Sequence, residues 1–118
     1  MFDAQLLIEG SVVYSPWFAR GGDNAIFTLD VVQYMLGTNN SLTVEVLTKS
    51  SEDTGDGDAI SNVVITATAA GRSSVECDST VSNGINELVR YKFTVSGDST
   101  GSVLFRMLTP VWFDEVSA

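Results

Sequence analysis

Apolar and polar residues alternate in short runs along most of this chain, and turn-forming residues separate the runs at intervals of roughly 8–12 residues. The clearest run places Leu42, Val44 and Val46 on one side of an extended segment and Thr43 and Glu45 on the other. No segment carries the pattern of an amphipathic helix. The chain is therefore expected to be all-β.

The pattern predicts about eight strands in one domain that spans residues 1–118, arranged as an antiparallel β-sandwich or jelly roll. We expect the first two strands to form a hairpin across Gly10-Ser11, and a bulge where the alternation slips at Val31-Val32. The expected strands lie within Phe2–Glu9, Val12–Tyr14, Ala25–Met35, Ser41–Lys49, Ile60–Ala69, Ser74–Cys77, Glu87–Val95 and Ser102–Leu108.

Charge and composition exclude several classes of function. Fifteen acidic residues against six basic ones give a net charge of −9, which opposes binding to nucleic-acid phosphates or to anionic membrane surfaces. The sequence contains no histidine, which removes Ser-His-Asp and Cys-His catalysis and the usual zinc ligands. We expect a protein that is not an enzyme and has no cofactor, no metal ligands, no direct nucleic-acid partner and no membrane partner.

The single cysteine and the N-terminal segment give two further expectations. Cys77 has no second cysteine to pair with, and its surroundings predict a half-buried strand residue rather than a reactive thiol. Residues 1–9 are acidic and contain an apolar run of only three residues, which is not the pattern of a signal peptide. We expect synthesis in a cytoplasm.

The loop Ser50–Asp58 contains two motifs that point to chemistry. Asp53-Thr54-Gly55 matches the triplet of aspartic proteases, but polar residues precede it, whereas a shared-proton dyad needs a desolvated carboxyl pair. Glu52–Asp58 also offers carboxylates for Ca²⁺, although their spacing is not that of an EF-hand. Two interpretations of this loop stay open, an ion-binding loop and a solvated acidic connection.

Aromatic residues gather in two segments outside the strands expected to form the core. Tyr14, Trp17 and Phe18 precede Arg20, and Trp112 and Phe113 lie near the C-terminus. Such residues either stack on sugars, anchor a protein interface or plug the open ends of a sandwich. Of the first two we favour the interface, and we assign to it Tyr14, Trp17, Phe18, Arg20, Trp112 and Phe113.

We expect different roles for the basic residue beside the aromatic loop and for the two basic residues on one strand. Arg20 next to Gly21-Gly22 is suited to docking on a partner, or alternatively to a local ion pair with Asp23. Arg90 and Lys92 alternate with Tyr91 and Phe93, so we expect these two cations simply to line a solvated face.

The whole chain, which is short, acidic, free of histidine and rich in strands with aromatic loops, resembles the decoration or cement proteins of tailed-phage capsids. The segment Ser15–Ala25 is also similar to a stretch of small phage-encoded proteins. The resemblance implies a virion protein on the capsid surface, made in the host cytoplasm. Such a protein binds the major capsid protein, forms a dimer or trimer, and stabilises contacts between capsid subunits.

A carbohydrate-binding β-sandwich is the alternative. In that case Tyr14, Trp17 and Trp112 would stack on sugar rings, and Asp23 or Asp114 would accept hydrogen bonds from sugar hydroxyls.

Overall fold

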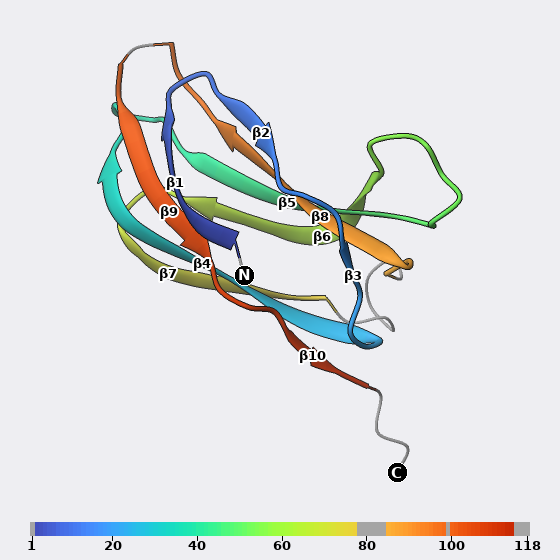
Figure 1. Ribbon diagram of the computed structural model, residues 1–118. Helices are drawn as coiled ribbons and strands as arrows, with labels where there is room; N and C mark the ends of the chain where they lie inside the picture. The colour runs from blue at the N-terminus through green and yellow to red at the C-terminus, as the bar shows by residue number, and fades with distance from the viewer. Residues whose placement is uncertain (1, 78–84, 99, 115–118) are drawn as a thin grey trace.

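The computed structural model describes residues 2–77, 85–98 and 100–114, and within these residues it contains ten strands and no helix (Figure 1). The strands form two five-stranded antiparallel sheets that pack face to face as a β-sandwich. The predicted all-β sandwich is confirmed. The count of about eight strands was too low, because the short β3 and β10 form in segments that were assigned to loops.

The first sheet is built around the long strand β4. Strand β9 pairs with residues 29–35 of β4, β10 with residues 24–26 and β7 with residues 25–31. Since β7 shares β4 residues with both β9 and β10, it lies on the opposite edge of β4, and β10 continues β9 after Pro110. Strand β1 pairs only with β9 in the described chain. The strands of this sheet are β1 (Phe2–Ile8), β4 (Asn24–Met35), β7 (Gly71–Cys77), β9 (Ser102–Met107) and β10 (Val111–Phe113).

The second sheet has the order β2-β8-β5-β6, with β3 pairing β8 beyond the end of β2. Its β6 strand is bulged, since Asn62 adopts a positive φ of 65° and the register with β5 shifts between Glu45 and Leu47. The strands of this sheet are β2 (Val12–Tyr14), β3 (Phe18–Ala19), β5 (Leu42–Lys49), β6 (Asp58–Ala67) and β8 (Leu88–Val95).

The expected hairpin between the first two strands is wrong. Strand β1 pairs with β9 in the first sheet, whereas β2 pairs with β8 in the second sheet, so the Gly10 turn crosses from one sheet to the other. Gly10 has a φ of 86°, a conformation that favours glycine. The carboxylate of Glu9, only 6% exposed, accepts hydrogen bonds from the Gly37 amide at 2.8 Å and Asn40 Nδ2 at 3.1 Å. These bonds tie the crossing to the β4–β5 connection.

The core lies between the sheets and follows the predicted alternation. The inward residues of β4, β5 and β8 are almost fully buried, among them Phe27, Val44 and Phe93. The predicted bulge in β4 is confirmed, since the register with β9 shifts between Val31 and Gln33. The alternation therefore predicted the buried faces of β5 and β8.

The two lateral sides of the sandwich differ. On one side β6 and β7 contact each other and join the two sheets. On the other side lie β1 and β2, which are the edge strands of their sheets and are connected by the Gly10 turn (Figure 1). This second side leaves two sheet edges unpaired among the described strands.

Candidate functional site: an aromatic and cationic cluster on the second sheet

A cluster of aromatic and basic side chains lies on the outer face of the second sheet. Tyr14 of β2 is paired with Lys92 of β8, and residues directly opposite in an antiparallel pair share a face. Arg90 lies on the same face of β8, because the alternating residues Tyr91 and Phe93 are buried in the core. We call Tyr14, Trp17, Lys49, Arg90 and Lys92 the cation–aromatic cluster.

The Arg90 guanidinium contacts two aromatic rings. Its Cζ lies 4.8 Å from the centroid of the Tyr14 ring and 4.5 Å from that of Trp17. Lys49 Nζ lies 4.6 Å from the Trp17 centroid, and Lys92 Nζ lies 5.9 Å from that of Tyr14. These distances are those of cation–π contacts, which stabilise each cation without neutralising its charge.

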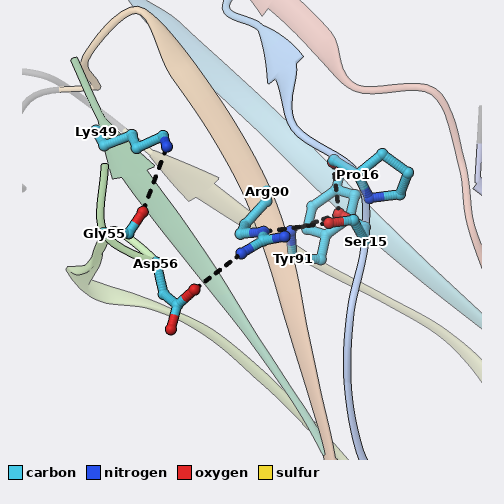
Figure 2. Close-up of polar contacts among 7 residues, drawn as sticks. All are labelled: Ser15, Pro16, Lys49, Gly55, Asp56, Arg90 and Tyr91. Carbon is cyan, nitrogen blue, oxygen red and sulfur yellow. Dashed lines mark hydrogen bonds and ion pairs between the residues drawn. The ribbon is translucent and has the colours of Figure 1, made fainter. Parts of the chain in front are cut away.

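Ser15 fixes the position of Arg90 from the chain that links β2 to β3. The Arg90 Nε donates a hydrogen bond to the Ser15 carbonyl at 3.2 Å (Figure 2). The buried Ser15 hydroxyl accepts a bond from the Tyr91 amide at 2.8 Å and donates to the Pro16 carbonyl at 3.0 Å. Ser15 thus joins the outer cluster to the buried side of β8.

The acidic loop between β5 and β6 borders the cluster (Figure 2). Asp56 Oδ1 lies 3.7 Å from Arg90 Nη1, and Lys49 Nζ donates to the Gly55 carbonyl at 3.3 Å. At Gly57 a Cβ atom would lie only 2.6 Å from Cη2 of Trp17, so the loop backbone packs directly on the indole. The loop therefore depends on a glycine for its close approach to Trp17.

The electrostatics of the cluster differ from those of the whole chain. Three of the six basic residues lie in it, although the net charge of the chain is −9. The Arg90 side chain is only 16% exposed, while its ion-pair partner Asp56 is 81% exposed. A partly desolvated guanidinium between rings is suited to bind a carboxylate or backbone carbonyl of a partner.

Phe18 and Trp112, both assigned to the interface from sequence, pack against the core at one end of the sandwich. The Phe18 ring lies 5.4 Å from that of Tyr91, and the Trp112 ring lies 5.9 Å from that of Phe27 at an interplanar angle of 87°. Trp112 lies in the short strand β10, which is not among the expected strands, and it nevertheless packs against the core. Phe18 and Trp112 thus occupy the positions of the plugging alternative.

Arg20 and Phe113 lie apart from the cluster. The Arg20 Nη1 donates to the Ile85 carbonyl at 2.5 Å, and no ion pair with Asp23 is present in the described chain. Gly21, which follows Arg20, packs on the Trp112 indole, where a Cβ atom would lie 2.7 Å from Cδ1. Phe113 is 37% exposed on β10. The structure thus brings together only Tyr14 and Trp17 of the six predicted interface residues.

The other candidate residues are placed as follows. Asp53 is exposed and forms a local turn, in which its carboxylate accepts a bond from the Ser50 amide at 3.3 Å. Cys77 is fully buried at the end of β7 rather than half-buried. No group of three or more metal-ligating side chains occurs in the described ranges. The same ranges contain no helix long and apolar enough to cross a bilayer.

Sequence reasoning missed the role of Arg90 and Lys49. The alternation correctly placed Arg90 on the outer face, but nothing in the sequence indicates that Ser15 and Trp17 lie beside it, 75 and 73 positions earlier in the chain. The available signal was the pair of tryptophan and tyrosine residues flanking a proline, which predicts a shaped loop but not its partner.

Comparison with family models, with curated proteins and with solved structures found no match to this chain. The functional proposal therefore depends on the geometry of the chain itself.

Proposed function

We propose that this chain is a non-catalytic structural protein of the capsid-decoration type, which binds the outer surface of a tailed-phage capsid and stabilises contacts between major-capsid subunits. The observation that supports it most is the cation–aromatic cluster. Tyrosine, tryptophan and arginine are the residues that contribute most to protein interfaces, and here they meet on one open sheet face. The proposal requires no cofactor, and the protein would reside on the virion.

The charge distribution suits such a partner. The cations of the cluster offer donors to carboxylates and carbonyls on the capsid surface, while the net charge of −9 keeps the protein from binding packaged DNA. Because Tyr14 is 38% exposed beside Arg90, a partner can bury both without opening the core.

The carbohydrate-binding alternative has weaker support. Sugar stacking needs an open ring face, but Trp17 is contacted by Lys49, Arg90 and the backbone of Gly57. Trp112 packs edge-to-face on Phe27 and so does not extend the same platform. Binding on a broad glycan array that is lost in the Tyr14→Ala variant would favour this alternative over capsid binding.

The test is co-sedimentation with capsids assembled from the major capsid protein of the same genome. We expect saturable binding that weakens at least tenfold in Tyr14→Ala and falls with added salt. Phe113→Ala is the matched control, because Phe113 is exposed to the same degree, 37%, but lies outside the cluster. A protein that stays in the supernatant at every concentration, or equal losses in both variants, would contradict the proposal.

A further inference from the structure

Strand β1 is an edge strand, and its second half, residues 5–8, lacks the usual protection against pairing. It lies at the rim of the first sheet, and β9 is its only partner among the described strands (Figure 1). Its register with β9 shifts between Phe2 and Gln5, and from Gln5 to Ile8 the pairing is regular. Edge strands normally carry charges, proline or bulges that prevent association, and residues 5–8 contain neither a charge nor a proline.

The outer face of this edge is apolar. Leu6 is 63% exposed and Ile8 is 58% exposed, which makes them two of the most exposed large hydrophobic side chains in the described chain. The neighbouring β9 places Leu104 opposite Leu6, and Met35 of β4, 60% exposed, lies in the same row as Ile8 through Ser102. These side chains make the edge and the adjoining sheet face largely apolar, with Ser102 between Ile8 and Met35.

The remaining sheet edges differ from β1. Strand β7 carries Arg72 and Glu76, and β6 is bulged at Asn62 and contacts β7. The edge formed by β2 and β3 consists of two short strands separated by Pro16. Among the described edges, residues 5–8 of β1 combine regular pairing with an exposed face that carries no charge, whereas Asp3 and a register shift lie in the first half of the strand.

We infer that β1 pairs antiparallel with β1 of a second copy of this chain about a two-fold axis, so that the first sheets of two molecules form one continuous sheet. With the axis at Leu7, Leu6 of each copy lies opposite Ile8 of the other, and the apolar row continues across the dimer. The pairing of β1 does not depend on the proposed function. Only the role that we give the dimer rests on that function.

Charge limits where a second copy can bind. Two molecules of net charge −9 repel each other, so self-association requires a contact strip without carboxylates. Residues 5–8 are such a strip, and the nearby carboxylate of Asp30 is paired with Arg106 at 2.9 Å and Arg72 at 3.7 Å. Contact along β1 therefore adds no unpaired like charges at its centre.

A stable dimer would require contacts beyond the paired strands themselves. A stable interface buries about 800 Å² per partner, which is roughly one-eighth of the 6421 Å² surface of this chain. The strand itself spans about 23 Å, from seven residues at ~3.3 Å each.

A dimer would have two capsid-binding sites, one on each copy of the chain. Pairing through β1 extends the first sheet and leaves the cation–aromatic cluster open on the second sheet. Each dimer then presents two clusters, and binding two capsid subunits at once raises the effective affinity without any new contact.

The test is light scattering coupled to size-exclusion chromatography on the full chain. We expect the wild type to have twice the 12.6 kDa chain mass and the Leu6→Lys/Ile8→Lys variant to have the single mass. Val111→Lys is the matched control, since Val111 is 58% exposed on β10, and it should stay dimeric. Circular dichroism and thermal melting verify that each variant is folded. A wild type that is monomeric at every concentration up to ~0.5 mM, or a dimer that survives both lysines, would overturn the inference.

A second measurement does not depend on destabilising the edge. Residues opposite each other in an antiparallel pair have Cα atoms about 4.5–5.5 Å apart, which allows a disulfide. Mixing Leu6→Cys with Ile8→Cys molecules under oxidation should give a cross-linked dimer at least tenfold more abundantly than either variant alone. The native Cys77 is fully buried and does not compete. No enrichment in the mixture would contradict pairing about Leu7.

The two proposals fail separately. Capsid binding by a strictly monomeric protein would overturn the β1 dimer and leave the decoration function intact. A dimer that depends on Leu6 and Ile8 but never binds capsids would do the reverse. The Tyr14→Ala variant should retain the dimer mass, because the cluster lies on the other sheet.

Discussion

The two tryptophans of this chain are similar in burial but differ in the chemistry of their neighbours. Each is half-buried, and each packs on a glycine at which a Cβ atom would lie within 2.7 Å of the indole, Gly57 for Trp17 and Gly21 for Trp112. Trp17, however, contacts the cations of Lys49 and Arg90 on the outer face of the second sheet. Trp112 contacts the ring of Phe27 at the end of the core.

This difference teaches that burial alone does not tell an interface residue from a core residue. Trp112 exchanges water for aromatic carbon, so its removal leaves a cavity beside Phe27. Trp17 exchanges water for cation–π contacts with Lys49 and Arg90 on the outer face, so its removal opens no cavity in the core and costs less stability. The identity of the partners, cationic or aromatic, distinguishes the two roles.

The largest effect is expected from Trp112→Ala compared with Trp17→Ala. Trp112→Ala should lower the free energy of unfolding by about 3 kcal/mol and Trp17→Ala by about 1 kcal/mol, since only the first opens the core. Urea titration followed by circular dichroism measures both values. Equal losses of stability in the two variants would show that Trp17 is a core residue. That result would contradict the interpretation of the cluster as an interface.

The sequence predicted much of the fold because side-chain alternation needs only local information. It assigned the inward faces of β5 and β8 and placed the bulge at Val31-Val32 correctly. It could not predict that β1 and β2 join different sheets, because a tight turn at Gly10 is compatible with a hairpin and with a crossing. Strand pairing depends on long-range packing that a turn motif does not specify.

The same limit applies to the candidate site. Aromatic content singled out Tyr14 and Trp17, but their cationic partners come from β5 and β8, and only the strand register brings them together. The segment Arg20-Gly21-Gly22 was interpreted as suited to docking on a partner, whereas Gly21 allows Trp112 to pack closely. Single-sequence patterns predict which face a side chain occupies and not which side chains meet there.

The contact between the acidic loop and Trp17 can be broken at one glycine. Gly57→Ala should lower the stability by about 1–2 kcal/mol, because its φ of 89° strains any other residue and the new Cβ would clash with the indole. Gly55→Ala in the same loop is the control, since nothing lies within 4 Å of its Cβ position. Thermal melts compare the two variants, and a similar loss in both would show that the loop does not pack on Trp17.

Tyr91, the buried neighbour of Arg90 on β8, should make the stability of the protein depend on pH. Burial raises the pKa of Tyr91, whose hydroxyl has no hydrogen-bond partner among the described residues. In the unfolded chain the phenol ionises near pH ~10, so the stability is complete below that pH and falls above it. At pH 11 the loss from Tyr91 is about 1.4 kcal/mol, and Tyr91→Phe should abolish it.

The control for this prediction is the same variant at neutral pH. There Tyr91→Phe removes an unsatisfied hydroxyl and should be neutral or stabilising by up to about 1 kcal/mol. Urea titrations of both proteins between pH 8 and 11 measure the difference. An identical alkaline slope in wild type and variant would contradict the burial of the phenol.

The smallest effect is expected at the ion pair on the outer face. Asp56→Asn should change the stability by less than about 0.5 kcal/mol, because the Asp56 side chain is 81% exposed and its oxygen lies 3.7 Å from Arg90. Glu52→Gln makes the same charge change in the same loop without a contact to Arg90 among the described residues, so the difference between the two variants isolates the pair. That difference should vanish in ~1 M salt, where the Debye length is about 3 Å. If it persists, the Arg90 guanidinium is already committed to the loop and is less available to a partner, which would weaken the distinction between the outer tryptophan and the inner one.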